Sequence, residues 1–437
     1  RGMRPVACKC GPDYIDPMFH RYVLGIPGRN LDGFFVSAEE IRNSLFSAMD
    51  REQADIAVLE GVMGYYDGLG GISLKASSWD IASATGTPAV LILNCRGVSL
   101  SAAAMASGFC RFVENSRIRG IILNRISSMY YSRLAPAIEE RAGIPVLGFL
   151  PESEEYRIES RHLGLFIPEE INALRERIGK LADQMEKTVN VEGLLRLSHS
   201  SEDVCLGKNS ESAEKRVPER AESGKRLRIG VARDEAFCFY YQENLELLER
   251  LGGTAVYFSP LRDRELPDGL DGLILGGGYP ENYGKELAEN ISMRESVRQA
   301  AASGLPFLAE CGGFLYLHRN LEGSDGQMYP VAGVYPFDAF RTGKLGRFGY
   351  VTLTSSERPV IRGHEFHYWE SENPGSDWYA EKPSPDGGKK RGWYCMHDSG
   401  SQIGGFPHLY YPSCPEFLER WLSCCREYRE ERREHEG

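Results

Sequence analysis

The sequence predicts an α/β protein with two doubly wound parallel sheets. Continuous apolar runs alternate with amphipathic helical patterns through residues 1–190, and the same alternation starts again in residues 227–437. Strict alternation of strands and helices favours a parallel sheet covered by helices. Residues 191–226 are rich in Ser, Glu, Lys and Arg, which is typical of a solvated linker. We therefore expect two domains joined by a charged linker.

Four apolar runs in the first half are expected to be buried parallel strands. They are DIAVLEG (55–61), PAVLILN (88–94), RGIILNR (119–125) and PVLGFLP (145–151). Helical patterns lie between these runs, at 99–114 and 132–143.

The second half repeats this order of strand and helix. Its strands are expected at RLRIGVARD (226–234), GTAVYFSP (253–260), GLILGGG (272–278) and LPFLAEC (305–311). Residues 369–400 are polar and rich in Gly and Pro, so they are expected to form a loop insertion.

Composition excludes several classes of function. The 437 residues carry a formal net charge of −11, which argues against nucleic-acid binding. No run approaches the roughly 18 apolar residues of a membrane span, and no signal peptide is visible. The 11 cysteines are scattered without zinc-ligand spacing. A reducing cytoplasm is the simplest location for such a chain.

The segment LPFLAECGGFLYL (305–317) predicts a nucleophile at Cys311. An apolar strand leads into the cysteine, small residues follow, and a helical pattern begins at once. This is the layout of a nucleophile elbow with Cys in place of Ser. A helix that begins beside the sulfur favours the reactive thiolate. On this pattern alone, a buried structural cysteine is an equally good interpretation.

Two further segments support catalysis. The strand at 268–275 runs into Gly276, Gly277 and Gly278, whose backbone N–H groups are candidates for stabilising an oxyanion. Near the C-terminus, His408 precedes a Pro-containing turn and an amphipathic helix. The glycines can equally form an ordinary turn, and a lone His is more often structural. Together with Cys311, however, they fit a Cys–His hydrolytic pair.

The N-terminal half has a second polar region. The loop CKCGPDYIDPMFH (8–20) contains Lys9, Asp13, Asp16 and His20. The strand VLE ends in Glu60, and Asp67 follows in the next loop. A carboxylate at the carboxyl end of a parallel strand is a common position for phosphate-bound Mg²⁺. A surface loop with acidic residues would show the same pattern.

Residues 227–437 resemble a class I, triad-type glutamine amidotransferase domain, of the type found in the cobyrinic acid a,c-diamide synthase family. The matching motifs are AFCFYYQENLELLE (236–249), FSPLRD (258–263), LGGGYPE (275–281), AECGGFLYL (309–317), RFGYVTL (347–353), RGHEFHY (362–368) and PHLYYPSCP (407–415). The resemblance implies that Cys311 attacks glutamine, that His408 assists it, and that Gly277, Gly278 and Gly312 form the oxyanion site. The family usually has a second histidine where this chain has Tyr410. His364 and His367 are expected to contact substrate or to be structural.

Residues 1 to about 166 resemble the P-loop amide-forming domain of the same family, which is related to dethiobiotin synthetase. The matching motifs are KCGPDYIDP (9–17), RNLD (29–32), EGVMGYYDG (60–68), RGVSLSAAA (96–104), GIILNR (120–125) and SRHLGL (160–165). The expected fold is therefore a P-loop parallel-sheet domain followed by an amidotransferase domain.

The same resemblance implies roles for residues of the N-terminal half. Glu60 and Asp16 would help to place Mg²⁺, and Lys9 would lie near the ATP phosphates. Asn124 matches the residue that reads adenine. The loops that activate and aminate the carboxylate match Asp13, Tyr14, Asp16, Glu60 and Asp67. Arg161 and His162 are candidates for contacting the acidic side chains of a tetrapyrrole.

One departure from the family pattern concerns the N-terminus. The family begins with a strand and a Gly-rich P-loop, whereas this chain begins at RGMRPVACK without an initiator Met. We expect an N-terminally truncated sequence, from which the first strand and the P-loop residues are missing. Such a chain would bind ATP poorly.

The resemblance implies a ligase that forms C–N bonds. It would amidate the a and c carboxylates of cobyrinic acid in cobalamin biosynthesis, with glutamine as the nitrogen donor and ATP and Mg²⁺ as co-substrate and cofactor. Ni-sirohydrochlorin or hydrogenobyrinic acid are alternative acceptors, and cobyric acid synthase is a neighbouring activity. A non-catalytic nucleotide-binding relative is the alternative from another class. The expected partners are the small molecules, with no nucleic acid or membrane, and a homodimer is compatible with this interpretation.

Overall fold

The computed structural model describes residues 2–158, 168–199, 226–384 and 391–436, and it divides into two compact units. Unit 1 comprises Arg1–Gly33 and Ser37–Gly207, and unit 2 comprises Phe34–Val36 and Lys208–Gly437. Helix α7 (Val191–Ser198) occupies the start of the segment expected to be a linker. Its strongly apolar face, which includes Leu194 and Leu197, packs on a strand of unit 1, so this part of the segment is structured.

The strands of unit 1 are parallel, as predicted, but they form two sheets instead of one. The first sheet has the order β2-β1-β3, with β1 (Pro5–Cys10), β2 (Gly28–Leu31) and β3 (Ile56–Glu60). The second has the order β4-β5-β6, with β4 (Ala89–Asn94), β5 (Ile118–Asn124) and β6 (Val146–Leu150).

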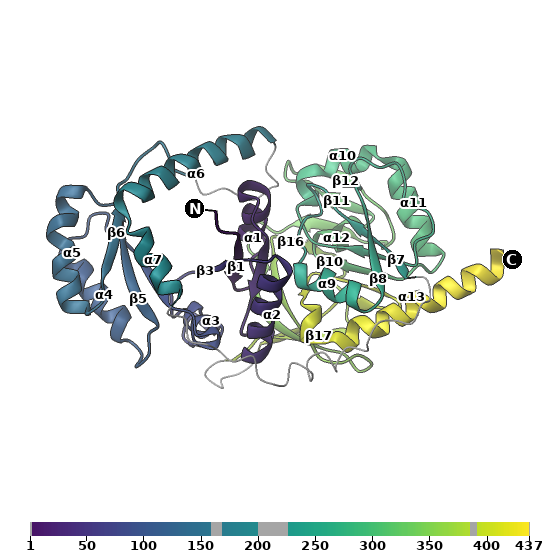
Figure 1. Ribbon diagram of the computed structural model, residues 1–437. Coiled ribbons are helices and arrows are strands. Elements are labelled where there is room, and N and C mark those ends of the chain that lie inside the picture. The colour runs from purple at the N-terminus through teal and green to yellow at the C-terminus, as the bar shows by residue number, and fades with distance from the viewer. Residues whose placement is uncertain (1, 159–167, 200–225, 385–390, 437) are drawn as a thin grey trace. The chain divides into compact units, whose positions relative to one another are not determined.

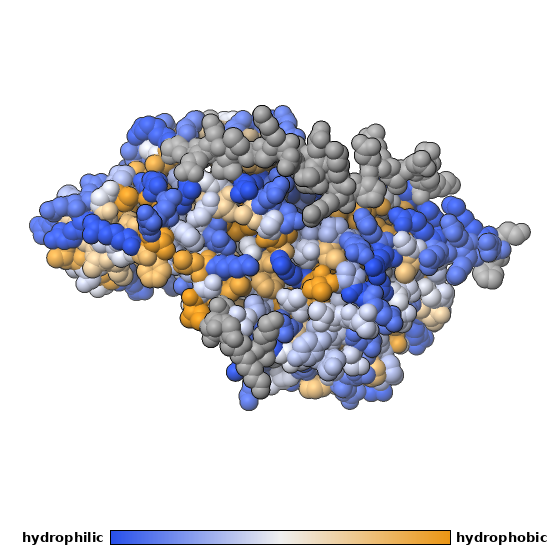
Figure 2. Space-filling view, turned by 90° about the horizontal axis from the view of Figure 1, so that it is seen from below, coloured by the Kyte–Doolittle hydropathy of each residue, from blue (hydrophilic) through white to orange (hydrophobic). Residues whose placement is uncertain are grey.

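The edge strands β3 and β4 keep the apolar composition of buried strands. Val58 on β3 is 55% exposed and Ile92 on β4 is 63% exposed, because each strand pairs on one side only within the described residues. Apolar patches interrupt a largely hydrophilic surface on the face of the molecule drawn in Figure 2.

Helices cover both faces of the second sheet of unit 1 (Figure 1). Helices α4 (Ser101–Arg111) and α5 (Ser128–Ala142) bury one face, and α6 (Pro168–Thr188) and α7 bury the other. The remaining helical segments of the unit are α1 (Ile15–Phe19), η1 (His20–Leu24), α2 (Ala38–Arg51), η2 (Leu69–Gly71) and α3 (Ser78–Thr85).

Unit 2 is built on a six-stranded sheet of order β19-β20-β10-β9-β7-β8, in which only β19 is antiparallel. Its strands are β7 (Leu227–Ala232), β8 (Gly253–Phe258), β9 (Gly272–Leu275), β10 (Phe307–Glu310), β19 (His397–Asp398) and β20 (Gln402–Gly405). The helical segments are α9 (Gln242–Arg250), η3 (Pro280–Tyr283), α10 (Gly284–Glu289), α11 (Ile291–Ala302), α12 (Gly312–Tyr316), η4 (Tyr411–Ser413) and α13 (Pro415–Glu436). Two large apolar cores lie against this sheet.

Two further sheets complete unit 2. An antiparallel sheet has the order β18-β17-β14-β15-β21, with β14 (Arg347–Thr354), β15 (Ile361–His367), β17 (Trp378–Glu381), β18 (Gly392–Cys395) and β21 (His408–Leu409). A mixed sheet has the order β12-β11-β13-β16, with β11 (Asn320–Glu322), β12 (Met328–Pro330), β13 (Asp338–Arg341) and β16 (Trp369–Ser371). The expectation of a loop insertion at 369–400 was wrong, because β16 to β19 lie in that range and pair with three sheets.

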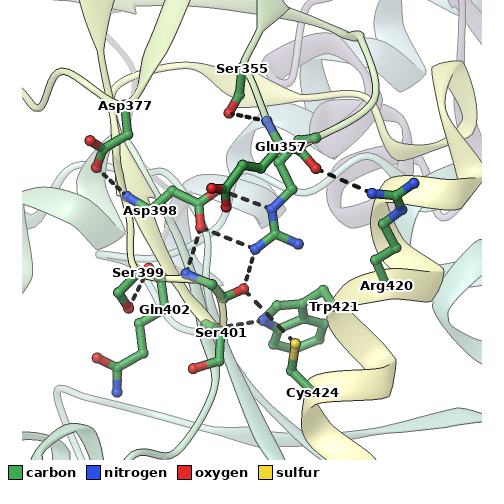
Figure 3. Close-up of polar contacts among 12 residues, drawn as sticks. Ser355, Glu357, Asp377, Asp398, Ser399, Ser401, Gln402, Arg420, Trp421 and Cys424 are labelled. Atoms are coloured by element: carbon green, nitrogen blue, oxygen red, sulfur yellow. Dashed lines mark hydrogen bonds and ion pairs between the residues drawn. The ribbon is translucent and has the colours of Figure 1, made fainter.

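A buried ion pair fixes the chain that leads into β20. Both oxygens of Asp398 bind the guanidinium of Arg358, with Nε at 3.1 Å and Nη2 at 3.0 Å. Asp398 also accepts from Trp378 Nε1 at 3.1 Å and from the Gly400 N–H at 2.9 Å. Figure 3 shows Asp398 among its polar contacts, and the indole of Trp421 from α13, which donates to Ser401 O at 3.1 Å. A carboxylate with four donors can be buried at little cost.

Candidate active sites

Cys311 lies at a strained turn between β10 and α12. Its φ of 47° and ψ of −104° are unusual for a residue with a side chain, and such strain is found mostly at functional sites. The turn is held by the Cys311 N–H, which donates to Gly405 O at 2.8 Å. The structure therefore has the strand, turn and helix that the sequence predicts here.

The glycine turn after β9 lies directly beside the Cys311 turn. A Cβ atom added to Gly312 would stand 2.9 Å from the backbone nitrogen of Gly278, and one added to Gly277 would stand 2.2 Å from Cε1 of His408. The two glycines thus bring the turn into contact with both the cysteine loop and the histidine ring. The Gly276 N–H donates to Tyr240 Oη at 2.9 Å and is not available to a substrate.

His408 is buried on β21, where it lies opposite His364 of β15 in the sheet register. Burial lowers the pKa of His408, and with the smaller effects of the nearby His364 and His367 it falls to about 3. The imidazole is therefore neutral at pH 7, which is the form that accepts a proton.

The surroundings of Cys311 favour the protonated thiol. Burial raises the pKa of Cys311 far above its ordinary value and the charge of Glu281 adds to this rise, whereas the Gly312 N–H lowers it. The helix start acts in the expected direction, but the effect of burial on the pKa is larger. Thiolate formation therefore needs proton transfer to a base.

Glu310, which the sequence interpretation did not single out, links the two catalytic segments. It is buried directly before Cys311 and accepts from Tyr411 Oη at 2.8 Å. Burial raises its pKa to about 8, whereas the Tyr411 hydroxyl and the Leu409 N–H lower it. Asn244 binds the same segment, with 2.8 Å from its Nδ2 to Leu409 O and 2.9 Å from the Tyr411 N–H to its Oδ1. The only signal in the sequence was a charged residue in an otherwise apolar strand.

Tyr410, at the position of the expected second histidine, has a packing role. Its ring stacks on Phe35 with centroids 4.7 Å apart and meets Tyr241 edge-on at 5.3 Å. His367 is also packed, because it stacks on Phe406 at 4.0 Å and its Nδ1 lies 2.6 Å from Trp369 O.

In unit 1, charged residues gather at the ends of β1 and β3. Lys9 and Glu60 are paired in the sheet register, and Lys9 Nζ lies 3.4 Å from Glu60 Oε1. Lys9 also forms a close ion pair with Asp16, and His20 Nε2 lies 2.9 Å from Glu60 Oε2. The structure thus brings together three residues, Lys9, Asp16 and Glu60, that the sequence placed in one site.

The other N-terminal candidates are distributed more widely. Burial raises the pKa of Asp13 to about 6; the Ile15 N–H opposes this shift and the neighbouring Asp16 increases it. Tyr14 is buried at the start of α1. Asp67 accepts from the Gly64 N–H at 3.0 Å, which is a local turn contact, and Asn124 ends β5 of the second sheet. Arg161 and His162 lie outside the described residues.

The chemistry of these residues fits Mg²⁺ in part. Asp16 and Glu60 offer carboxylate oxygens, and Mg²⁺ is commonly held by one or two carboxylates with phosphates and water. The described residues contain no group of three or more His, Cys, Asp or Glu side chains that would form a metal site on their own.

The comparisons with known proteins agree with this fold and identify the family. The model of the CobB/CobQ-like glutamine amidotransferase domain matches residues 228–413, which defines the class of unit 2. The cobyrinate a,c-diamide synthase of Caldanaerobacter subterraneus subsp. tengcongensis is 36% identical over 96% of this chain and 91% of that protein. Those of Listeria innocua and Salmonella typhimurium are 38% and 37% identical, over 96% and 98% of this chain and 92% of each protein.

The chain is a glutamine-dependent amide-forming ligase. It belongs to the cobyrinate a,c-diamide synthase family, so the resemblance seen in the sequence is confirmed. No helix in the described part of the chain is both long and apolar enough to span a membrane.

Proposed function

We propose that this protein amidates the a and c side-chain carboxylates of cobyrinic acid in cobalamin biosynthesis, using ATP and glutamine. The observation that supports it most directly is the buried Cys311 at a strained turn, next to the glycine turn that also contacts a neutral His408. Cobyrinic acid is proposed as the acceptor because the relatives are named cobyrinate a,c-diamide synthases.

The first half-reaction releases ammonia in unit 2. His408 accepts the thiol proton as Cys311 attacks the side-chain amide of glutamine. The N–H groups of Gly277, Gly278 and Gly312 are proposed to hold the oxyanion, and the closeness of Gly278 to Gly312 supports this. Ammonia leaves with the proton from His408, and water then hydrolyses the thioester to glutamate.

The second half-reaction is proposed for unit 1. ATP phosphorylates a carboxylate of the acceptor, and ammonia displaces phosphate from the acyl phosphate to give the amide. Lys9 would bind phosphate, Asn124 would read adenine, and Arg161 and His162 would bind acidic groups of the acceptor. Asp13, Tyr14 and Asp67 would line the loops where the carboxylate is activated.

Asp16 and Glu60 are the residues proposed to hold Mg²⁺. The bound ion would neutralise phosphate charge. Lys9 forms ion pairs with both carboxylates, so the three side chains lie at one site. When ATP is bound, Lys9 could exchange its carboxylate partners for phosphate oxygens while the carboxylates hold the ion.

The full-length protein with glutamine and MgATP tests the proposal. Cobyrinic acid and Ni-sirohydrochlorin are offered separately, and mass spectrometry reads the products. Two carboxylate-to-amide conversions on cobyrinic acid are expected. Conversion of Ni-sirohydrochlorin alone would reassign the acceptor, and no conversion of either with continued glutamine hydrolysis would contradict the proposed acceptor.

Substitution of the nucleophile separates the two half-reactions. Cys311→Ala should abolish glutamine hydrolysis, because the thioester cannot form, and should leave amidation with free ammonia intact. Release of glutamate at the wild-type rate by this variant would show that Cys311 is not the nucleophile.

A further inference from the structure

Glu365 is a buried carboxylate without a hydrogen-bonding partner in the described structure. It lies on β15 of unit 2 and is 0% exposed. Neither of its oxygens forms a hydrogen bond with any described residue. Burial of an ionised carboxylate costs several kcal/mol unless it is paired. An orphaned group of this kind in a folded protein needs an explanation, and a missing ligand is one.

The surroundings of Glu365 carry complementary charge. Gly349 of β14 lies opposite Glu365, and Arg347 lies opposite His367, so Arg347 and Glu365 are on the same face of the sheet. Nη1 of Arg347 is buried and also lacks a hydrogen-bond partner among the described residues. Its guanidinium lies over the Trp393 ring at 4.9 Å. Burial raises the pKa of Glu365 to about 7, whereas the Arg347 charge and the nearby indole N–H of Trp393 lower it; this N–H approaches Glu365 but does not reach hydrogen-bond geometry with any described residue.

This face of β15 adjoins the nucleophile. Cys311 donates its N–H to Gly405, the next residue is Phe406, and the ring of Phe406 stacks on His367. His367 and Glu365 are two residues apart on one strand, so their side chains share a face. The charge of Glu365 also raises the pKa of Cys311, as expected for a carboxylate close to the sulfur.

We propose that Glu365 binds the α-ammonium group of glutamine and so selects amino-acid amides over other amides. This inference rests on the proposed glutaminase reaction of Cys311. The amide end of glutamine must reach the sulfur, and its other end carries an ammonium group that needs an anion when it is desolvated. A buried carboxylate beside Cys311, whose oxygens accept no hydrogen bond from the described residues, supplies that anion, and the ammonium group would donate the hydrogen bonds that these oxygens lack.

Glu281 is another carboxylate whose charge raises the pKa of Cys311, with a larger effect than those of Glu365 and Glu310, and it provides a matched control. It follows the glycine turn on η3, it is 9% exposed, and the charge of Arg341 acts on it. Its oxygens are not among the buried orphans of the described chain. We therefore assign the ammonium group to Glu365.

The test compares two amides in the full-length protein. The first is glutamine, and the second is 4-carbamoylbutanoate, which is glutamine without its α-amino group. The kcat/KM of each is measured for the wild type, Glu365→Gln and Glu281→Gln. The preference for glutamine should fall roughly 10- to 100-fold in Glu365→Gln, mainly through KM, because one charge-assisted interaction is lost. Glu281→Gln should keep the preference.

A thermal measurement separates binding from a structural role. Without glutamine, Glu365→Gln should melt no lower than the wild type, because the substitution removes an unpaired buried charge. In a Cys311→Ala background, glutamine should raise the Tm, and Glu365→Gln should reduce that rise. A lower Tm of the unliganded Glu365→Gln variant would show that Glu365 holds the fold and would overturn the inference.

The outcomes distinguish this inference from the proposed function. An unchanged preference in Glu365→Gln, or a preference lost only in Glu281→Gln, would overturn the assignment and leave the Cys311 reaction standing. If the wild type shows no Cys311-dependent hydrolysis of glutamine, both are overturned.

Discussion

At the scale of single residues, Glu310 shows how burial controls ionisation in unit 2. Its carboxyl has an ordinary pKa near that of a free Glu when the chain is unfolded and about 8 when it is folded. The folded protein therefore binds one more proton than the unfolded chain between these pKa values. Because of this difference, the contribution of Glu310 to stability falls as the pH rises from about 5 to about 8.

Glu310→Gln removes this titration and keeps an acceptor for Tyr411. The Tm of the variant should rise relative to the wild type as the pH is raised from 5 to 8.5, with little further change above that. Thermal melts of both proteins across this range measure the difference. Glu281 and Glu365 also have a raised pKa, so their contributions to stability fall with rising pH as well. Both residues are present in the wild type and in Glu310→Gln, so the difference in Tm between these two proteins reports the titration of Glu310. If the Tm of both proteins changed with pH by the same amount, the prediction would be contradicted.

The protonation of Cys311 and His408 also depends on burial. Both side chains were predicted from the sequence by residue type and spacing, and their roles remain predictions. Their resting charge states could not be predicted, since a free cysteine beside a helix start would be more acidic than usual. The structure encloses both groups, and desolvation then favours the thiol and the neutral imidazole.

At the scale of elements, the Arg358–Asp398 pair joins the β14–β15 connection to β19. Both side chains are less than 10% exposed, so removal of one partner leaves a buried charge unpaired. Arg358→Met should lower the Tm of unit 2 by on the order of 10 °C.

The control for this prediction is an exposed ion pair. Arg420 lies 2.5 Å from Glu416 on α13, and its side chain is 49% exposed. Arg420→Met should shift the Tm by about 1 °C or less, because exposed pairs contribute little. Equal effects of the two substitutions, measured by calorimetry, would show that burial of the Arg358 pair does not stabilise unit 2.

The long apolar runs of the sequence predicted their strands well, because each run pairs in a parallel sheet, although β3 and β4 lie at partly exposed edges. The range 369–400 was predicted poorly. Its strands are two to four residues long, and the segment before β17 contains Pro374 and Gly375. Short strands of this kind are stabilised by neighbours distant in sequence, such as β14 for β17, so local pattern carries little signal.

At the scale of the whole molecule, unit 2 includes three residues from early in the chain. Phe35 of the Phe34–Val36 segment is 1% exposed and stacks on Tyr410, two residues after His408. Arg362 holds this segment by donating to Phe34 O at 2.8 Å and Phe35 O at 2.9 Å. No local pattern near residue 35 indicated a contact with the C-terminal half.

Phe35→Ala should therefore affect the glutaminase site as well as stability. Loss of a buried ring costs about 3–5 kcal/mol in typical cores, and the cavity would leave Tyr410 and the neighbouring His408 less well positioned. A lower Tm and slower glutamine hydrolysis are expected together. Phe112→Ala, at a ring that is 67% exposed, is the control and should change neither. A lower Tm with unchanged hydrolysis would contradict the positioning role.

The sequence by itself determined the fold class and the family, and it predicted the position of the nucleophile. These features follow from local order: apolar runs alternate with helical patterns, and a cysteine stands between a strand and a helix. The tertiary structure decided the division of the first half into two sheets, the placement of Phe35 in unit 2, and the burial of Glu310 and Glu365 beside Cys311. These properties depend on contacts between residues far apart in the chain, and burial, which sets charge states and leaves Glu365 unpaired, exists only once those contacts have formed.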